Sequence, residues 1–174
     1  NTTLDLTAYA SNYDLTAYAH LILDRLSRWL GLPACIGIGR TKTEAKMANH
    51  IAKKNSYLKG VCNLVSMDYC SIESLYQTIE VSEVWGVGKK HTEKLNSLSI
   101  NTVLDFVCAS PLMIRNQFSI VMHRTLLELQ GISCIEIEQS PKAKKQIIAS
   151  RSFGQKVYSR DDLKEAITRY VQDA

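Results

Sequence analysis

The hydrophobic pattern of the chain changes near residue 71, and this change limits the possible folds more than any other feature. Before it, short apolar runs at 34–39 and 61–65 alternate with amphipathic stretches at 15–30 and 41–54. After it, apolar residues recur every three or four positions in short blocks, the period of helices rather than strands. We therefore expect an α+β fold, with strands and packed helices in the first part and only helices in the second.

Local patterns place further elements. Leu4, Leu6 and Ala8 alternate with polar residues, which predicts a strand at 3–9 with one buried face. The two tryptophans, Trp29 and Trp85, are expected to be core anchors. Helices after the change of pattern are expected at 71–79, 91–98, 102–109, 111–117, 120–129 and 161–172.

Composition excludes several classes of protein. With 45% hydrophobic residues and a net charge of +4 over 174 residues, the chain is neither disordered nor as basic as a histone. It has no apolar run long enough to cross a bilayer and no signal peptide. It does not begin with Met, so we expect the natural N-terminus to be missing. Five cysteines without a CxxC pair indicate reduced thiols rather than a disulfide scaffold or a metal site.

A glycine turn followed by a lysine-bearing helix is the first candidate site. Gly37-Ile38-Gly39 follows an apolar run and opens the helix expected at 41–54, where backbone N–H groups can hold a phosphate. The spacing is not that of a P-loop or a dinucleotide fingerprint, and such glycines often serve only backbone geometry. At about 100° per residue, Lys42, Lys46, Asn49 and Lys53 share an arc of about 60°. An anionic ligand would relieve the repulsion among the lysines, whereas the alternative is a solvated basic face.

The second candidate site is a glycine-rich turn between helical stretches, with the sequence Val84-Trp85-Gly86-Val87-Gly88-Lys89-Lys90. The spacing of Gly86, Val87 and Gly88 is typical of a helix-hairpin-helix motif, in which the glycines bring the backbone close to a DNA phosphate. Val87 would plug into the helix pair. Lys89 and Lys90 would begin the next helix, where charge and N–H groups add for an anion. Such a contact carries no base information, so it predicts sequence-independent DNA binding; a plain turn is the alternative.

A basic run follows the helical part. Residues 139–160 contain six basic residues and no acidic one, and Ser140-Pro141 marks a boundary. The helix expected at 161–172 has too little chain around it to cover its apolar face. We expect residues 140–174 to be a linker and the start of a third domain. DNA-contacting residues are expected in the run at Lys142, Lys144, Lys145 and Arg151.

Taken together, these segments resemble the Y-family translesion DNA polymerases of the UmuC type. The resemblance covers residues 3–170, and its motifs, in family order, are specific as a set. They are Ile36-Gly37-Ile38-Gly39; Thr41-Lys42-Thr43-x-Ala45-Lys46-x-Ala48-Asn49-His50-x-Ala52-Lys53-Lys54; Val84-Trp85-Gly86-Val87-Gly88; Thr102-Val103-Leu104-Asp105-Phe106; Arg124-Thr-x-x-Glu128-Leu-x-Gly131; and Ser150-Arg151-Ser152-Phe153-Gly154. Glu44 departs from the family, which tends to carry an apolar residue there.

The resemblance implies three regions. Residues 1–78 would be the C-terminal part of a palm, 79–139 a thumb with the helix-hairpin-helix, and 140–174 a basic tether with the start of a little-finger domain. It also implies that Lys53 contacts the β- and γ-phosphates of the incoming nucleotide, with Lys46 and Lys42 beside it. The thumb turn would grip the primer–template duplex, and the tether would lie along the DNA.

The resemblance also implies what this chain lacks. The family transfers nucleotides with two Mg²⁺ ions held by carboxylates, and its Ser-x-Asp-Glu motif would end at or just before Asn1. We therefore expect no catalytic residue, no metal site and no bound cofactor in this chain, which would be a fragment inactive by itself.

For the intact protein, the resemblance implies error-prone synthesis opposite damaged template in the SOS response, in the cytoplasm of a bacterium and at its nucleoid. Its partners would be DNA, dNTP and, by the same resemblance, UmuD′ and RecA, with no membrane. One alternative is a stand-alone helix-hairpin-helix DNA-binding module without catalysis. Another is a glycosylase or nuclease using Asp105, although the neighbours of Asp105 indicate a residue of a packed helix.

Overall fold

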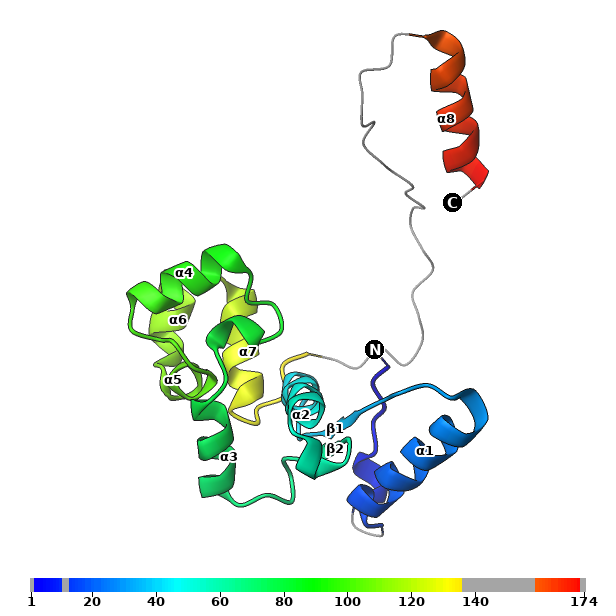
Figure 1. The fold of residues 1–174 in the computed structure, drawn as a ribbon. Helices are drawn as coiled ribbons and strands as arrows, with labels where there is room; N and C mark the ends of the chain where they lie inside the picture. Colours follow the sequence, from blue (N-terminus) through cyan, green and yellow to red (C-terminus); the bar gives the residue numbers. More distant parts are fainter. Residues whose placement is uncertain (1, 11–12, 136–158, 173–174) are drawn as a thin grey trace. The chain divides into compact units, whose positions relative to one another are not determined.

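The computed structural model of the chain describes residues 2–10, 13–135 and 159–172 (Figure 1). The chain divides into two compact units, Asn1–Ile137 and Glu138–Ala174. In the second unit, the structure describes the helix α8 (Arg160–Gln172). All further elements belong to the first unit, which is mostly helical and contains one small parallel sheet. This combination agrees with the expected α+β class.

The sheet joins two short strands that flank a helix. The strands β1 (Ile36–Ile38) and β2 (Val61–Asn63) pair in parallel, with Gly37 opposite Cys62. The helix α2 (Lys42–Lys54) and the 3₁₀ helix η2 (Ser56–Leu58) connect them. The helix α1 (Leu15–Leu30) begins at Asp14, whose carboxylate accepts hydrogen bonds from the first turn, and ends at a left-handed Gly31. Figure 1 shows α2 beside both strands.

The strand expected at residues 3–9 is wrong. The segment contains the 3₁₀ helix η1 (Thr7–Tyr9). The carboxylate of Asp5 accepts hydrogen bonds from the backbone N–H and the hydroxyl of Thr7, at 3.0 and 2.6 Å. These local bonds favour a turn over an extended backbone. The alternation of Leu4, Leu6 and Ala8 was therefore a misleading signal.

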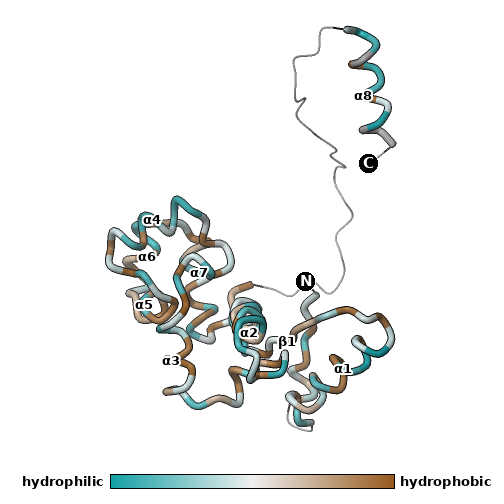
Figure 2. The backbone as a smooth tube through the Cα atoms, in the orientation of Figure 1, coloured by the Kyte–Doolittle hydropathy of each residue, from teal (hydrophilic) through white to brown (hydrophobic). Residues whose placement is uncertain are grey.

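The helical part follows the sequence pattern closely. The elements are α3 (Tyr69–Gln77), η3 (Val81–Glu83), α4 (Lys89–Ser97), α5 (Val103–Cys108), α6 (Pro111–Gln117) and α7 (Ile120–Leu129). The starts of α3, α5 and α7 carry side-chain caps, including Ser119 before α7 and a reciprocal pair formed by Thr102 and Asp105 before α5. Asp105 is thus a capping residue, which agrees with the packed-helix interpretation. In Figure 2, α4 is mostly hydrophilic, and Leu95 is its one buried residue.

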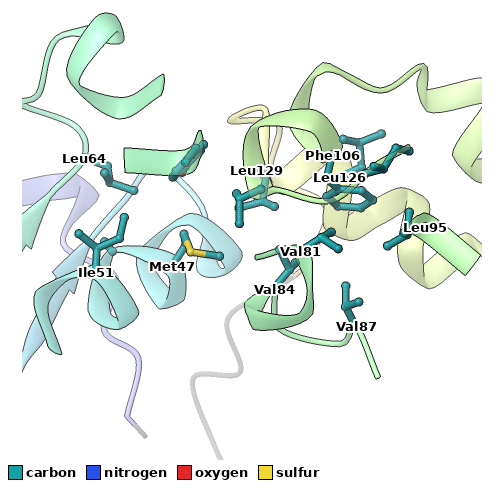
Figure 3. Close-up of a cluster of buried hydrophobic side chains, with 14 of the residues drawn as sticks. Met47, Ile51, Leu64, Val81, Val84, Val87, Leu95, Phe106, Leu126 and Leu129 are labelled. Atoms are coloured by element: carbon teal, nitrogen blue, oxygen red, sulfur yellow. The ribbon is translucent and has the colours of Figure 1, made fainter. Parts of the chain in front are cut away.

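One hydrophobic core joins the α2 and sheet region to the later helices. Met47, Ile51 and Leu64 come from the α2 and sheet region, whereas Phe106 and Leu126 come from the later helices. Figure 3 shows these side chains as parts of one cluster with Val81, Val84, Val87, Leu95 and Leu129. The two sequence patterns therefore do not give two separate cores. They fold as one compact unit.

Both tryptophans are outside this core. Trp29 is 77% exposed near the end of α1, and Trp85 is 47% exposed. The prediction that they anchor the core is therefore wrong. The cysteines are all free thiols, and burial raises the pKa of Cys62 to about 11. Among the helices that the structure describes, none is long and apolar enough to cross a membrane.

Candidate functional site

The first candidate site is the corner between β1 and α2, where the glycines serve close packing. A Cβ atom on Gly37 would lie 2.1 Å from the backbone nitrogen of Asn49, and one on Gly39 would lie 2.5 Å from that of Ala45. Backbone atoms cannot move aside as the end of a side chain can. The two glycines therefore allow α2 to lie directly against the strand, which is the backbone interpretation of this turn.

Three N–H groups at this corner, those of Arg40, Thr43 and Glu44, are already bound within the chain. The backbone N–H of Arg40 donates to the carboxylate of Glu44, and the hydroxyl of Thr41 caps the N–H of Glu44. The side chain of Glu44 is 1% exposed and pairs with the guanidinium of Arg40 at 2.8 Å. This pairing explains how a buried carboxylate is tolerated at this position.

A remote carboxylate completes the cap of α2. Glu128, near the end of α7, is fully buried and accepts a hydrogen bond from the N–H of Thr43 at 3.0 Å. Its other oxygen accepts from Cys134 and Ile135, at 2.7 and 2.8 Å. Burial raises the pKa of Glu128, but these hydrogen bonds outweigh burial and hold the pKa below its ordinary value of 4.5. At the start of α2, carboxylates of the same chain therefore accept the hydrogen bonds of the Arg40 and Thr43 N–H groups.

The lysine stripe of α2 is present as a helical face. Because α2 is helical from Lys42 to Lys54, Lys42 and Lys46 are about 6 Å apart along the axis, and Lys53 is about 16 Å from Lys42. Lys42 and Lys46 are half-buried, and Lys53 is exposed. Among the described carboxylates, none pairs with these three lysines. The stripe therefore presents three positive charges along one face of α2.

The second candidate site is the turn between η3 and α4. The N–H of Val87 donates to the carbonyl of Val84 at 3.0 Å, and Gly86 has a φ of +92°, a conformation that favours glycine. Val84 and Val87 are 2% and 8% exposed and fix both ends of the turn in the core, as Figure 3 shows. Gly86 and Gly88 lie exposed on the surface between and beside them. The turn is thus anchored in the core on its inner side and open to solvent on its outer side.

The start of α4 is open, unlike that of α2. Gly88 precedes the helix in an extended conformation, with a φ of −88° that any residue adopts. A Cβ atom there would meet no described heavy atom within 4 Å. No side chain among the described residues caps the first N–H groups of α4, and Lys89 and Lys90 are exposed. Uncapped N–H groups beside two ammonium groups are suited to an external anion.

A contact that sequence reasoning missed joins the two candidate sites. The ammonium of Lys46 lies 3.5 Å from the centroid of the Trp85 ring. Burial, with the neighbouring charge of Lys42 as a smaller cause, lowers the pKa of Lys46. The sequence signals were a lysine at an expected position and an aromatic residue just before Gly86. Neither signal shows that the two side chains are in contact.

A cavity of about 280 Å³ beside α2 was also not predicted. It is bordered by Lys54 of α2 and by Glu80 and Glu83 around η3, among others. His50 lies at the same cavity, with its Nδ1 3.4 Å from the carboxylate of Glu83. Two carboxylates make this cavity unsuitable for a phosphate tail.

Several predicted residues are outside what the structure describes. Lys142, Lys144, Lys145 and Arg151 fall in the undescribed range 136–158, so their expected contact with DNA stays a prediction. Within the described residues, no group of three His, Cys, Asp or Glu side chains could hold a metal ion.

Comparison with known proteins finds similarity to one family over part of the chain and to individual proteins over most of it. The profile of the impB/mucB/samB family matches residues 1–50. The chain is 40% identical to the protein ImpB of Salmonella typhimurium over 157 residues, which are 90% of this chain and 37% of ImpB. It is 39% identical to UmuC of Salmonella typhimurium strain LT2 over 171 residues, 98% of this chain and 40% of UmuC.

A more distant similarity extends to a DNA polymerase. DNA polymerase IV of Streptococcus thermophilus is 26% identical over 151 residues, 87% of this chain and 39% of that protein. The chain thus spans about 40% of the length of the curated relatives that it matches. The UmuC-type resemblance that the sequence motifs indicated is confirmed.

Proposed function

We propose that this chain is part of a Y-family translesion DNA polymerase of the SOS response, and that its own activity is sequence-independent binding of duplex DNA. In this proposal, residues 1–78 belong to the palm, 79–139 to the thumb, and 140–174 to the tether and the start of the little finger. The turn from Gly86 to Lys90 acts as the helix-hairpin-helix that grips the phosphate backbone. Contacts with UmuD′ and RecA stay predictions without assigned residues.

The observation that carries this proposal is the open start of α4. Neither the backbone conformation at Gly88 nor the packing around it requires a glycine. A glycine at such a place is explained by the close approach of another molecule to the backbone. The uncapped N–H groups and the ammonium groups of Lys89 and Lys90 would attract a negatively charged molecule. A DNA phosphate meets all of these requirements.

The α2 stripe is proposed to face the triphosphate of the incoming nucleotide. Lys53 is exposed at the far end of the helix, and Lys46 and Lys42 follow on the same side. Since the N–H groups of Arg40, Thr43 and Glu44 are bound within the chain, the lysine side chains would supply most of any grip on phosphate.

Family polymerases use two Mg²⁺ ions, and the described residues of this chain do not fit that group. They include no carboxylate cluster able to hold a metal ion. We therefore assign no step of nucleotidyl transfer to this chain. An unrelated DNA-binding module is not proposed, because the similarity to UmuC covers 171 residues and so includes the lysine-bearing stretch of α2 as well as the turn.

The test is binding of the full chain to a fluorescein-labelled duplex of about 30 base pairs, measured by anisotropy. If about four phosphates are neutralised, the logarithm of the association constant should fall with the logarithm of salt concentration at a slope of about −3.6. Two duplexes of different sequence should bind equally. The double variant Lys89→Glu with Lys90→Glu should lose at least tenfold in affinity.

The matched control is Lys53→Ala, which removes a lysine of the other stripe and should leave duplex affinity nearly unchanged. A flat salt dependence would contradict the proposal. Equal losses in the control and in the Lys89 and Lys90 variant would show that the turn is not the duplex-binding element.

A further inference from the structure

The contact between Lys46 and Trp85 has no role in the proposed function as stated so far. Lys46 is on the stripe assigned to the nucleotide, whereas Trp85 is next to the turn assigned to the duplex. The ammonium of Lys46 lies 3.5 Å from the centre of the indole ring of Trp85. This separation is typical of a cation held over the face of an aromatic ring.

The surroundings of Lys46 make this contact significant. Its ammonium is partly removed from water and lies near Lys42, and both conditions disfavour a charge. Among the described carboxylates, none pairs with it. The face of the Trp85 ring is therefore the group that compensates the charge in this structure.

The surroundings of Trp85 also indicate that its contact with Lys46 is important. The residue is 47% exposed, so hydrophobic burial does not fix its ring. Val84 and Val87 anchor the backbone of the turn in the core, but both are on the inner side. On the outer side, the Lys46 side chain ties the exposed ring, and hence residues 85–88, to the surface of α2.

We propose that Trp85 is a positioning residue that holds the duplex-binding turn against α2 through the ammonium of Lys46. This inference rests on the proposed function, because it concerns the same turn. It adds that duplex affinity depends on Lys46, a residue on the nucleotide stripe that need not contact the duplex. Loss of either partner frees the outer side of the turn, so that Lys89 and Lys90 no longer meet the phosphates in one fixed geometry.

A double-mutant cycle on duplex affinity tests this inference. The variants of the full chain are Lys46→Met, Trp85→Leu and the two together, with the labelled duplex described above. Each single variant should bind about threefold to tenfold more weakly. The double variant should bind no more weakly than the weaker single one, because the second change removes a contact already lost.

The matched control is the pair Lys42→Met and Trp85→Leu. Lys42 carries the same charge one helical turn away. The fold losses of duplex affinity caused by Lys42→Met and by Trp85→Leu should therefore multiply in the double variant. Trp85→Phe keeps an aromatic face and should retain part of the affinity lost in Trp85→Leu. Urea unfolding of every variant should show that the chain remains folded.

A second readout does not need DNA. With Trp29→Phe, Trp85 is the single tryptophan, and its emission should change when Lys46→Met is added but not when Lys42→Met is added. An unchanged emission would overturn the pairing. If wild type binds duplex but the effects of Lys46→Met and Trp85→Leu multiply, the positioning role is overturned and the proposed function stands. If wild type does not bind duplex, the proposed function fails and the positioning role fails with it.

Discussion

Two helices of this protein begin after a glycine-x-glycine sequence, and they use their glycines for opposite purposes. At the start of α2, Gly37 and Gly39 lie against backbone atoms, and the N–H groups bind carboxylates of the same chain. At the start of α4, Gly88 faces open space, and no described side chain caps the helix. The same sequence pattern is therefore structural in one place and available to a ligand in the other.

The charges follow the same division. The α2 start holds two buried carboxylates, Glu44 and Glu128, and Arg40 is the cation that pairs with Glu44. The α4 start presents the exposed side chains of Lys89 and Lys90. A helix that has its own anions does not need an external one. The comparison teaches that a glycine turn before a helix becomes a phosphate site only if the chain leaves its N–H groups free.

The largest effect is expected from Gly37→Ala. The added Cβ would clash with the backbone of Asn49 and Ala45, at 2.1 and 2.3 Å, so α2 would have to move away from β1. We expect a loss of about 3 kcal/mol in the free energy of unfolding, measured by urea denaturation.

The control for this prediction is Gly31→Ala. Gly31 has a φ of +62° but no described atom within 4 Å, so it carries backbone strain without a clash. Gly31→Ala should lower the free energy of unfolding by only about 1 kcal/mol. Equal losses in the two variants would mean that close packing is not the reason for the glycines before α2.

A smaller effect is expected from Glu128→Gln. One oxygen of the carboxylate accepts from Thr43 and the other from Cys134 and Ile135, so an amide must turn its NH₂ group toward one of these N–H donors. We expect a loss of about 2 kcal/mol in the free energy of unfolding at pH 7.

This loss should depend on pH in a defined direction. Because the pKa of Glu128 is lowered in the folded state, its charge stabilises the protein above the ordinary value of 4.5. That stabilisation disappears as the pH falls below 4.5 and through the lowered pKa. The difference between wild type and Glu128→Gln should therefore shrink on acidification. A difference that grows at low pH would contradict the assignment.

The smallest effect on stability, and the sharpest on binding, is expected at Gly88. Gly88→Ala should cost less than about 1 kcal/mol in stability, because nothing described blocks a Cβ there. Duplex affinity should nevertheless fall by about fivefold, since the Cβ keeps a phosphate away from the N–H groups.

Gly88→Ser separates the two effects further. A serine caps the first turn of α4, so stability should be equal to that of wild type or higher, while affinity still falls. Unchanged affinity in both variants would show that this helix start does not meet the DNA.

Much of the fold could be predicted because its signals are local. The caps Asp14, Thr41 and Thr102 lie next to the helices they begin, and the helices Pro111–Gln117 and Ile120–Leu129 match the expected bounds. Helical period and capping residues are visible in a short window of sequence. The α+β class and the glycine turn followed from the same kind of evidence.

Two of the missed features depend on long-range contacts, whereas a third is local. Glu128 binds the N–H of Thr43 across 85 residues of sequence, so no local pattern shows that the start of α2 is filled. Trp85 was expected in the core because tryptophan is large and apolar, but in the structure it meets an ammonium on the surface. Residues 3–9 alternated like a strand, although Asp5 and Thr7 favour a turn.

The tight contact of Gly37 and Gly39 with α2 also affects how evolutionary variation in relatives should be interpreted. Any homologue that keeps this strand and helix in contact must keep small residues at the two positions, whatever it binds. Invariance there would report only the architecture. Invariance at Gly88, where a side chain would fit, would instead record selection for a ligand.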